Sequence, residues 1–365
     1  MSTVTERRRD PISTTSYEPA GDAAPATLRA PSASPDARLR QTIERAPVST
    51  EYGAFLAQLR SPSSVHAELV SPTLRSSRDV AIQQRLDAFR DRFSGPYDIA
   101  GAKVVAPPMF RMNTPNSGNA AKAKAHAAEL HEICARAGVA SAAGPAGVGR
   151  PTPEQLVKVT QALLDAGKLP PPDEQHATLA DRIRGMQWEW GIGVDCAGYT
   201  QQAAADAHGA AGSAFKANLT GDIFSGMMND TRFTSVHITQ IRPGDVIHLD
   251  SPKRGEVGHN VICRSHAQLD EATRARMFGA ETGAIGKAFL AGKGPFHTFE
   301  VDSSWGAGNG SMHGGFRRDT WLFDESTFTW ASYPAGDRSL PLHVDPMTGP
   351  QDELFGGAFR PKEER

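Results

Sequence analysis

The chain has little cysteine and almost no net charge, and each scarcity excludes a class of protein. Its 365 residues include three cysteines, Cys134, Cys196 and Cys263, too few and too scattered for a disulfide framework or a C-x-x-C metal site. A net charge of -2 gives no sign of the concentrated basic face that binds nucleic acid. No window approaches the roughly 18 apolar residues of a membrane span. The sequence therefore predicts no metal, no nucleic-acid partner and no membrane span.

The start of the chain also lacks a secretory signal, because no apolar core of about 7–15 residues follows the basic residues 1–9. We therefore expect a protein that is cytoplasmic as made or is exported by a non-classical secretion system. Two glycine-rich segments, 144–150 and 283–287, lack the G-K-[ST] sequence of a phosphate-binding loop. Neither predicts a nucleotide site, and we expect no cofactor.

Composition divides the chain into four regions. Residues 1–78 are rich in Ser, Thr, Pro, Ala and Arg, and such a segment buries too little apolar surface to offset its ordering entropy, so we expect it to be largely disordered. Residues 79–185 are predicted to form a helical scaffold. Residues 186–340 carry the motifs described below and are interrupted by an insertion at 267–297. Residues 341–365 are typical of a polar tail on the surface.

Hydrophobic spacing predicts an α+β chain in which helices precede one antiparallel sheet. The best helix start is Thr152, where Pro153 occupies the first helical position and Gln155 completes a capping box. Beyond Gly209 the pattern changes to short strands separated by turns. The predicted helices cover residues 78–93, 119–138, 152–167, 176–186 and, in the insertion, 268–278; the predicted strands cover 246–249, 259–264, 298–302, 321–323 and 328–330.

One cysteine stands apart from the others. Cys134 lies among aliphatic residues of a predicted helix, as buried cysteines usually do, whereas glycines and Asp195 surround Cys196. An alanine-rich run follows Cys196 and stops at Gly209, which places the thiol in the first turn of a helix. Unpaired N–H groups and the helix dipole favour an anion there, and the thiolate is the nucleophile. We predict that Cys196 is catalytic.

A cysteine nucleophile needs a base within hydrogen-bond reach. The best placed histidine is His259, at the start of a predicted strand after a glycine. Strand alternation puts His259 on one face with Val261 and Cys263, and the residues between them on the other. The alternatives are the histidines at other element ends, namely His208, His248 and His266.

The base in turn needs an orienting partner, and Asp302 follows the next predicted strand. The other interpretation of Asp302 is a turn residue that caps the loop. A serine hydrolase is disfavoured because Ser311 lacks the G-x-S-x-G setting, and a metal hydrolase because no H-x-x-x-H pair occurs among His297, His313 and their neighbours.

Three motifs in order resemble the NlpC-type cell-wall cysteine peptidases, members of the papain-like group. They read W-G-I-G-V-D-C-A-G-Y, I-R-P-G-D-V-I-H-L and V-G-H-N-V-I-C, and together they span about residues 188–266. The resemblance implies a papain-like cysteine hydrolase core, with the nucleophile at the N-terminus of a helix packed on an antiparallel sheet. Ala197 departs from the family pattern, which has serine there.

The resemblance also implies roles for particular residues. Cys196 matches the nucleophile and His259 the base, while Asp302 falls where the third polar residue belongs. Asp195 matches the aspartate of the nucleophile motif, and it would shape the substrate site together with two tryptophans. These are Trp188 and Trp190.

The implied function is a cysteine hydrolase that cleaves amide bonds in the stem peptides of peptidoglycan. A wall substrate without a secretory signal suggests an exported antibacterial effector, whose further partner would be an inhibitor or immunity protein. Two alternatives remain open. One is a papain-like protease, deamidase or acyl-transfer enzyme that acts on proteins, and the other is a catalytically inert binding domain.

Overall fold

The computed structural model describes the helical and strand regions of the chain. Residues 1–75, for which we expected disorder, lie outside the described residues, as do 273–291 of the insertion and with them most of its predicted helix. The described backbone comprises residues 76–112, 119–212, 215, 227, 230–249, 258–272, 292–306, 314–326, 329–334 and 355–362.

The order of elements confirms a mixed α+β chain in which helices come first. Each predicted helix outside the insertion is present within a few residues of its expected bounds. Among the described residues, no helix has both the length and the apolar character needed to cross a membrane. The helices are α4 (Ser77–Arg92), α5 (Ala120–Arg136), α6 (Ala140–Gly147), α7 (Pro153–Asp165), α8 (Leu179–Glu189) and α9 (Cys196–His208), and a hairpin of β1 (Tyr97–Ile99) and β2 (Ala102–Val104) follows α4.

Helix starts follow the local chemistry that the sequence indicates. The Thr152 side chain accepts the Gln155 N–H and the Gln155 side chain accepts the Thr152 N–H, which confirms the capping box at α7. Thr178 and Asp181 make the same reciprocal pair at α8. Each box satisfies two backbone N–H groups that would otherwise lack partners. These caps fix where α7 and α8 begin.

The main sheet of the described residues has seven antiparallel strands in the order β3-β9-β4-β5-β6-β7-β8. A short 3-10 helix, Ile238–Gln240, leads from β3 toward β4. The strands are β3 (Phe233–Val236), β4 (Val246–Leu249), β5 (His259–Leu269), β6 (Phe296–Trp305), β7 (Gly315–Asp324), β8 (Thr329–Pro334) and β9 (Phe355–Pro361).

The C-terminal region corrects one expectation. Residues 341–365 were predicted to form a polar surface tail, but β9 inserts between β3 and β4 inside the sheet. The reason is local: Ala358 and Phe359 are buried and pack on opposite faces of the sheet. The Pro- and Gly-rich composition of the whole region conceals this short apolar strand.

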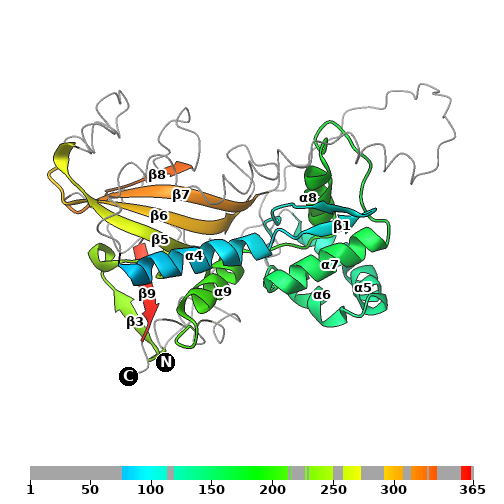
Figure 1. Ribbon diagram of the computed structural model, residues 1–365, viewed down its shortest axis with the longest axis horizontal. Coiled ribbons are helices and arrows are strands. Elements are labelled where there is room, and N and C mark those ends of the chain that lie inside the picture. The colour runs from blue at the N-terminus through cyan, green and yellow to red at the C-terminus, as the bar shows by residue number, and fades with distance from the viewer. Residues whose placement is uncertain are drawn as a thin grey trace, which may run out of the picture.

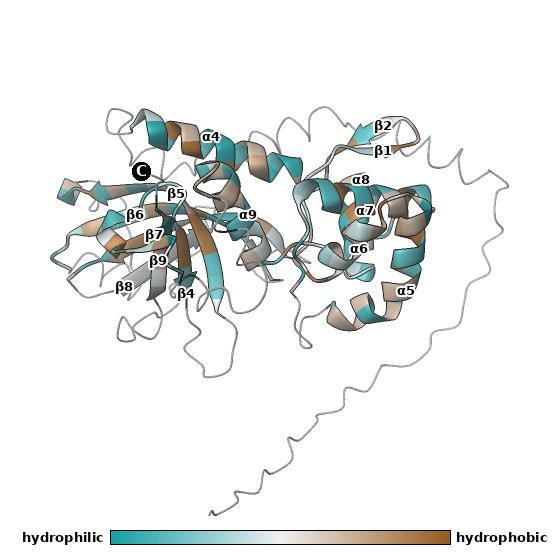
Figure 2. Ribbon diagram, turned by 90° about the horizontal axis from the view of Figure 1, so that it is seen from below, coloured by the Kyte–Doolittle hydropathy of each residue, from teal (hydrophilic) through white to brown (hydrophobic). Residues whose placement is uncertain are grey.

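The two faces of the sheet pack against different partners. Val246, Ile262 and Phe359 face a core that α4, α9 and the helices beyond them complete. The residues between them in the strands, such as Ile247 and Val261, belong to a second core on the other face. Both views show α4 and α9 beside the sheet and the helices α5–α8 in a separate lobe (Figure 1 and Figure 2).

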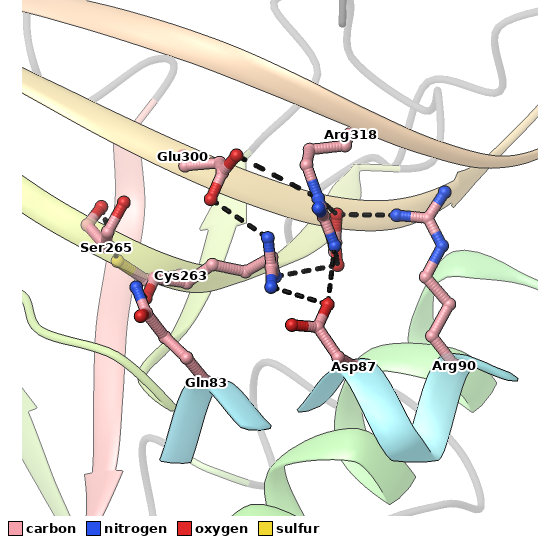
Figure 3. Close-up of polar contacts among 9 residues, drawn as sticks. Gln83, Asp87, Arg90, Cys263, Ser265, Glu300 and Arg318 are labelled. Atoms are coloured by element: carbon pink, nitrogen blue, oxygen red, sulfur yellow. Dashed lines mark hydrogen bonds and ion pairs between the residues drawn. The ribbon is translucent and has the colours of Figure 1, made fainter. Parts of the chain in front are cut away.

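A buried cluster of charges joins α4 to the sheet. It contains three arginines and three carboxylates, so its formal charges balance (Figure 3). Helix α4, at the start of the predicted helical scaffold, thus shares a core with α9 and has ionic partners from β5, β6 and β7 as well. The cluster consists of Asp87 and Arg90 from α4, Arg264 from β5, Glu300 and Asp302 from β6, and Arg318 from β7.

Asp302 is the centre of this charge cluster. Its carboxylate accepts hydrogen bonds from Arg90 Nη1 at 2.8 Å and from Arg318 Nε at 3.0 Å, and Arg264 Nε lies 3.2 Å away. Asp87 Oδ1 accepts hydrogen bonds from Arg264 Nη2 at 2.6 Å and from Arg318 Nη2 at 2.9 Å. Burial raises the pKa of Asp302, but the three guanidinium groups together hold it below the ordinary value. The carboxylate is therefore ionised in the folded protein.

Replacing Asp302 by asparagine should destabilise the fold strongly, because three buried guanidinium groups lose their central anion. Breaking such a pair typically costs about 3–5 kcal/mol of unfolding free energy. Urea unfolding followed by circular dichroism at pH 7 measures the change. Asp98→Asn, at the exposed Asp98–Lys103 pair, is the matched control and should leave the midpoint unchanged.

The same substitution has a pH signature. The folded pKa of Asp302 lies below its unfolded value, so this carboxylate stabilises the protein above about pH 4 and less as the pH falls further. The stability difference between the wild type and Asp302→Asn should shrink below about pH 4. A difference that stays constant down to pH 3 would contradict the ionised, paired carboxylate.

Candidate active site

The segment before α9 is held on both sides by backbone hydrogen bonds. Val194 N–H donates to the Met109 carbonyl at 2.9 Å, and Asp195 N–H donates to the Gly149 carbonyl at 2.9 Å. Gly191 has a φ of +59°, and a Cβ there would meet Ala123 at 2.4 Å. The glycines of the W-G-I-G approach thus allow close backbone contact, which fixes the entry of the chain into α9.

Asp195 caps the nucleophile helix. Its Oδ1 accepts the Gly198 N–H in the first turn of α9, and its Oδ2 pairs with Arg150 Nε at 2.8 Å. Burial raises the pKa of Asp195, although the Arg150 charge and the Gly198 N–H oppose this effect. The residue therefore shapes the helix start, and its two oxygens already have protein partners.

Cys196 is the first residue of α9, as expected, and only 5% of it is exposed. Burial, and next the neighbouring Asp195 carboxylate, raise the pKa of the thiol to about 12. The Asn260 N–H, which donates to the sulfur, and the Arg150 charge act in the opposite direction. The expected thiolate is therefore wrong for this state of the protein: the helix start does not outweigh burial beside a carboxylate.

His259, the predicted base, begins β5 but lies on the far side of the sheet from Cys196. It shares a face with Val261, whose core is separate from the one that contains Cys196. Its ring lies against the Trp305 ring, with centroids 3.7 Å apart and planes tilted by 36°, and its Nε2 is buried without a hydrogen-bond partner. Burial, with the charge of Arg317, lowers the pKa of His259 to about 3, so the ring is a weak base.

His248 and Asn260 lie on the face that Cys196 shares. They are cross-strand partners in β4 and β5, and His248 Nδ1 is 2.9 Å from Asn260 Oδ1. Both are buried, at 8% and 6% exposed. Asn260 thus contacts the imidazole through its side chain and the Cys196 sulfur through its backbone N–H. Asn260 therefore links a thiol and an imidazole, the two groups that a cysteine–histidine hydrolase needs.

Asp302 does not meet the role predicted for it. Its side chain is engaged by Arg90, Arg264 and Arg318, and it makes no hydrogen bond to His259. Its cross-strand partner is Ile262, which faces α9, whereas His259 faces the other core. Asp302 is therefore corrected from an orienting residue to the centre of the charge cluster.

The two tryptophans of the approach segment lie on or next to α8. Trp190 caps α8 and is 5% exposed; its ring is 4.6 Å from the His126 ring and 5.4 Å from Lys168 Nζ. These contacts come from α5 and from the segment after α7, so Trp190 anchors the helical lobe. Trp188 is half-buried on α8.

Sequence reasoning considered His248 only as an alternative base and did not consider Asn260 as its partner. The available signal was the alternation of β5, which separates Asn260 from His259. Ile262 follows Asn260 by two positions in β5, and Val246 precedes His248 by two positions in β4. These apolar residues therefore mark the face of the sheet that packs on a helix, and His248 and Asn260 lie on that face. The face of the sheet on which α9 packs is set by tertiary structure, and the glycine before His259 does not indicate it.

Within the described residues, no group of three or more His, Cys, Asp or Glu side chains could hold a metal ion. All three cysteines are free and buried. Comparison of the chain with family models, with curated proteins and with solved structures gives no match. The arrangement of side chains therefore carries the functional conclusion.

The resting state of Cys196 can be measured by alkylation with iodoacetamide. Because burial raises the thiol pKa to about 12, the rate should still be rising at pH 9–10 instead of levelling off near neutral pH. Peptide mapping by mass spectrometry separates Cys196 from Cys134 and Cys263. A plateau below pH 8 would contradict a protonated resting thiol.

Asp195→Asn should accelerate this alkylation. The substitution removes the charge that raises the thiol pKa and keeps an oxygen that caps the helix. A fall of one pKa unit increases the thiolate population about tenfold at a fixed pH well below the pKa. Asp206→Asn, on the same helix but near its C-terminus, is the matched control and should not change the rate.

Proposed function

We propose that the protein is a cysteine hydrolase that cleaves amide bonds, with Cys196 as nucleophile, His248 as base and Asn260 as the residue that orients the base. One observation carries the proposal. Asn260 contacts both groups: its Oδ1 accepts the Nδ1–H of His248 at 2.9 Å, and its backbone N–H donates to the Cys196 sulfur. The Oδ1 acceptor favours the tautomer with hydrogen on Nδ1, which leaves Nε2 able to accept a proton.

The chemistry follows from that tautomer. His248 Nε2 takes the proton from the Cys196 thiol as the sulfur attacks the substrate carbonyl. The imidazolium then protonates the leaving amine, and a thioester forms between Cys196 and the acyl group. Water, deprotonated by the same imidazole, hydrolyses the thioester and regenerates the thiol. Backbone N–H groups at the start of α9 are donors for the oxyanion.

A thiol with a raised pKa fits a mechanism in which proton transfer accompanies attack. Substrate binding over the buried thiol would change its surroundings, and the Arg150 guanidinium already lowers the thiol pKa from its position beside Asp195. The base is needed at the moment of attack, so the loss of His248 should affect kcat more than KM.

We propose peptidoglycan stem peptides as the substrate. The support for this class is the ordered resemblance of the three motifs to NlpC-type cysteine peptidases, together with a papain-like placement of the nucleophile at the start of a helix that packs on an antiparallel sheet. The base departs from that family pattern, because the histidine of the V-G-H-N motif faces away from α9.

A second candidate is a catalytically inert binding domain. The observation that favours it is the protonated, almost fully buried thiol. Purified protein and its Cys196→Ala variant should be incubated with isolated peptidoglycan, and the released fragments identified by mass spectrometry. New amino termini that appear with the wild type and not with the variant support the hydrolase. Fragments from neither protein would remove the proposed wall substrate.

The two histidines give a matched pair of variants. His248→Ala should lower kcat by about 10²–10⁴-fold, because general-base catalysis contributes that much. His259→Ala, one residue from Asn260 but on the other face, should retain most of the turnover of the folded enzyme. Thermal unfolding of both variants controls for loss of the ring contact between His259 and Trp305. Equal turnover losses in two folded variants would overturn the assignment of His248.

A further inference from the structure

Strand β6 continues past the point where β5 stops pairing with it. The β5–β6 register ends at Ile262 and Asp302, whereas β6 and β7 stay paired as far as Trp305 and Gly315. Residues 303–305 therefore have no β5 partner in the backbone ladder, although Ser303 and Trp305 still contact β5 through their side chains. The groups that would complete the ladder there need other partners.

The Asn260 N–H belongs to this unpaired stretch. Cys263 exchanges backbone hydrogen bonds with Gly244 and Asp245 on the β4 side, at 2.8 and 2.9 Å. Alternate residues of an antiparallel strand turn their N–H groups to opposite neighbours, so Asn260 turns toward β6. Because pairing has ended, the Cys196 sulfur accepts this N–H instead.

Two adjacent serines of β6 occupy the same stretch. Ser304 Oγ donates to the Val194 carbonyl at 2.7 Å, two residues before Cys196. Ser303 Oγ donates to the Asn260 carbonyl at 2.6 Å. Both serines are buried, at 0% and 1% exposed.

The two hydroxyls therefore hold the two halves of the site from one strand. Ser304 fixes the backbone that leads into the nucleophile, and Ser303 fixes the residue that contacts both the sulfur and His248. Successive side chains of a strand point to opposite faces of the sheet. Ser303 and Ser304 therefore bond from opposite faces of β6, one to the Asn260 carbonyl and the other to the Val194 carbonyl.

We propose that Ser303 and Ser304 are positioning residues that set the geometry between Cys196 and the His248–Asn260 pair. The inference rests on the proposed function where it is tested by kcat, but not where it is tested by alkylation of Cys196. Without the Ser303 hydroxyl the Asn260 carbonyl loses this donor, and without the Ser304 hydroxyl the Val194 carbonyl keeps the longer hydrogen bond from Arg111 N–H, at 3.2 Å, but loses its link to β6. Each loss frees the attached segment to shift. A displacement of about 1 Å at a reacting group can cost 10²-fold in rate.

The test compares Ser303→Ala and Ser304→Ala with Thr298→Val. Thr298 also lies on β6 and is fully buried, but its hydroxyl has no hydrogen-bond partner, so its removal controls for a lost buried hydroxyl. Ser303→Thr and Ser304→Thr keep the hydroxyl and test for rescue. Each protein is assayed for kcat and KM on peptidoglycan fragments, for Cys196 alkylation at pH 9, and for thermal unfolding.

We expect each alanine variant to lose about ten- to hundredfold in kcat with KM changed less than twofold. Ser303→Ala should also alkylate more slowly, because the Asn260 N–H then stabilises the thiolate less. The control should match the wild type in both readouts, and at least one threonine variant should recover kcat. A lower unfolding temperature with unchanged kcat and alkylation would show a purely structural role and overturn the proposal.

The alkylation readout separates this inference from the proposed function. If the wild type cleaves no peptidoglycan fragment, the proposed wall substrate fails, and slower alkylation of Ser303→Ala than of Thr298→Val still supports the positioning role. Alkylation of Ser303→Ala that is equal to the control, or faster, would overturn it, since the hydroxyl would then not hold the N–H against the sulfur.

Discussion

The hydrogen bond from the Asn260 N–H to the Cys196 sulfur depends on where two strands part. Pairing of β5 with β6 ends at Ile262, and two residues earlier in β5 the Asn260 N–H donates to the Cys196 sulfur at the start of α9. A helix end and a strand end are both regions of unmet backbone hydrogen bonds. Here the free N–H of the strand donates to the sulfur of the first helical residue, and the same Asn260 contacts the His248 imidazole through its side chain.

Two sets of charges on the same face of the sheet have different consequences. Around Asp302 three guanidinium groups surround a carboxylate, and its pKa falls despite complete burial. Beside Cys196 one carboxylate adds to burial, and the thiol pKa rises to about 12. The first arrangement docks α4 firmly, while the second keeps the nucleophile protonated until a base acts. Opposite signs of neighbouring charge, at similar burial, account for the difference.

Sequence patterns predicted what depends on local chemistry. The capping box at Thr152, the start of α9 at Cys196 and the strands that carry His248 and His259 all follow from neighbouring residues, and all are present. The choice between those two histidines depends on which face of β5 receives a helix, and no local residue decides it. The role of Asp302 was missed because its arginine partners lie as far away in sequence as Arg90 on α4.

The strand β9 shows how far the site depends on remote parts of the chain. Its pairing with β4 completes the sheet on the side of His248, with Gly357 as the cross-strand partner of that histidine. A residue with a side chain at this position would share the face of His248, because directly paired residues point the same way. Gly357 thus places no side chain beside the imidazole on the β9 flank, while Asn260 contacts it on the β5 flank. A C-terminal segment that composition assigns to a surface tail therefore helps to define the surroundings of the proposed base.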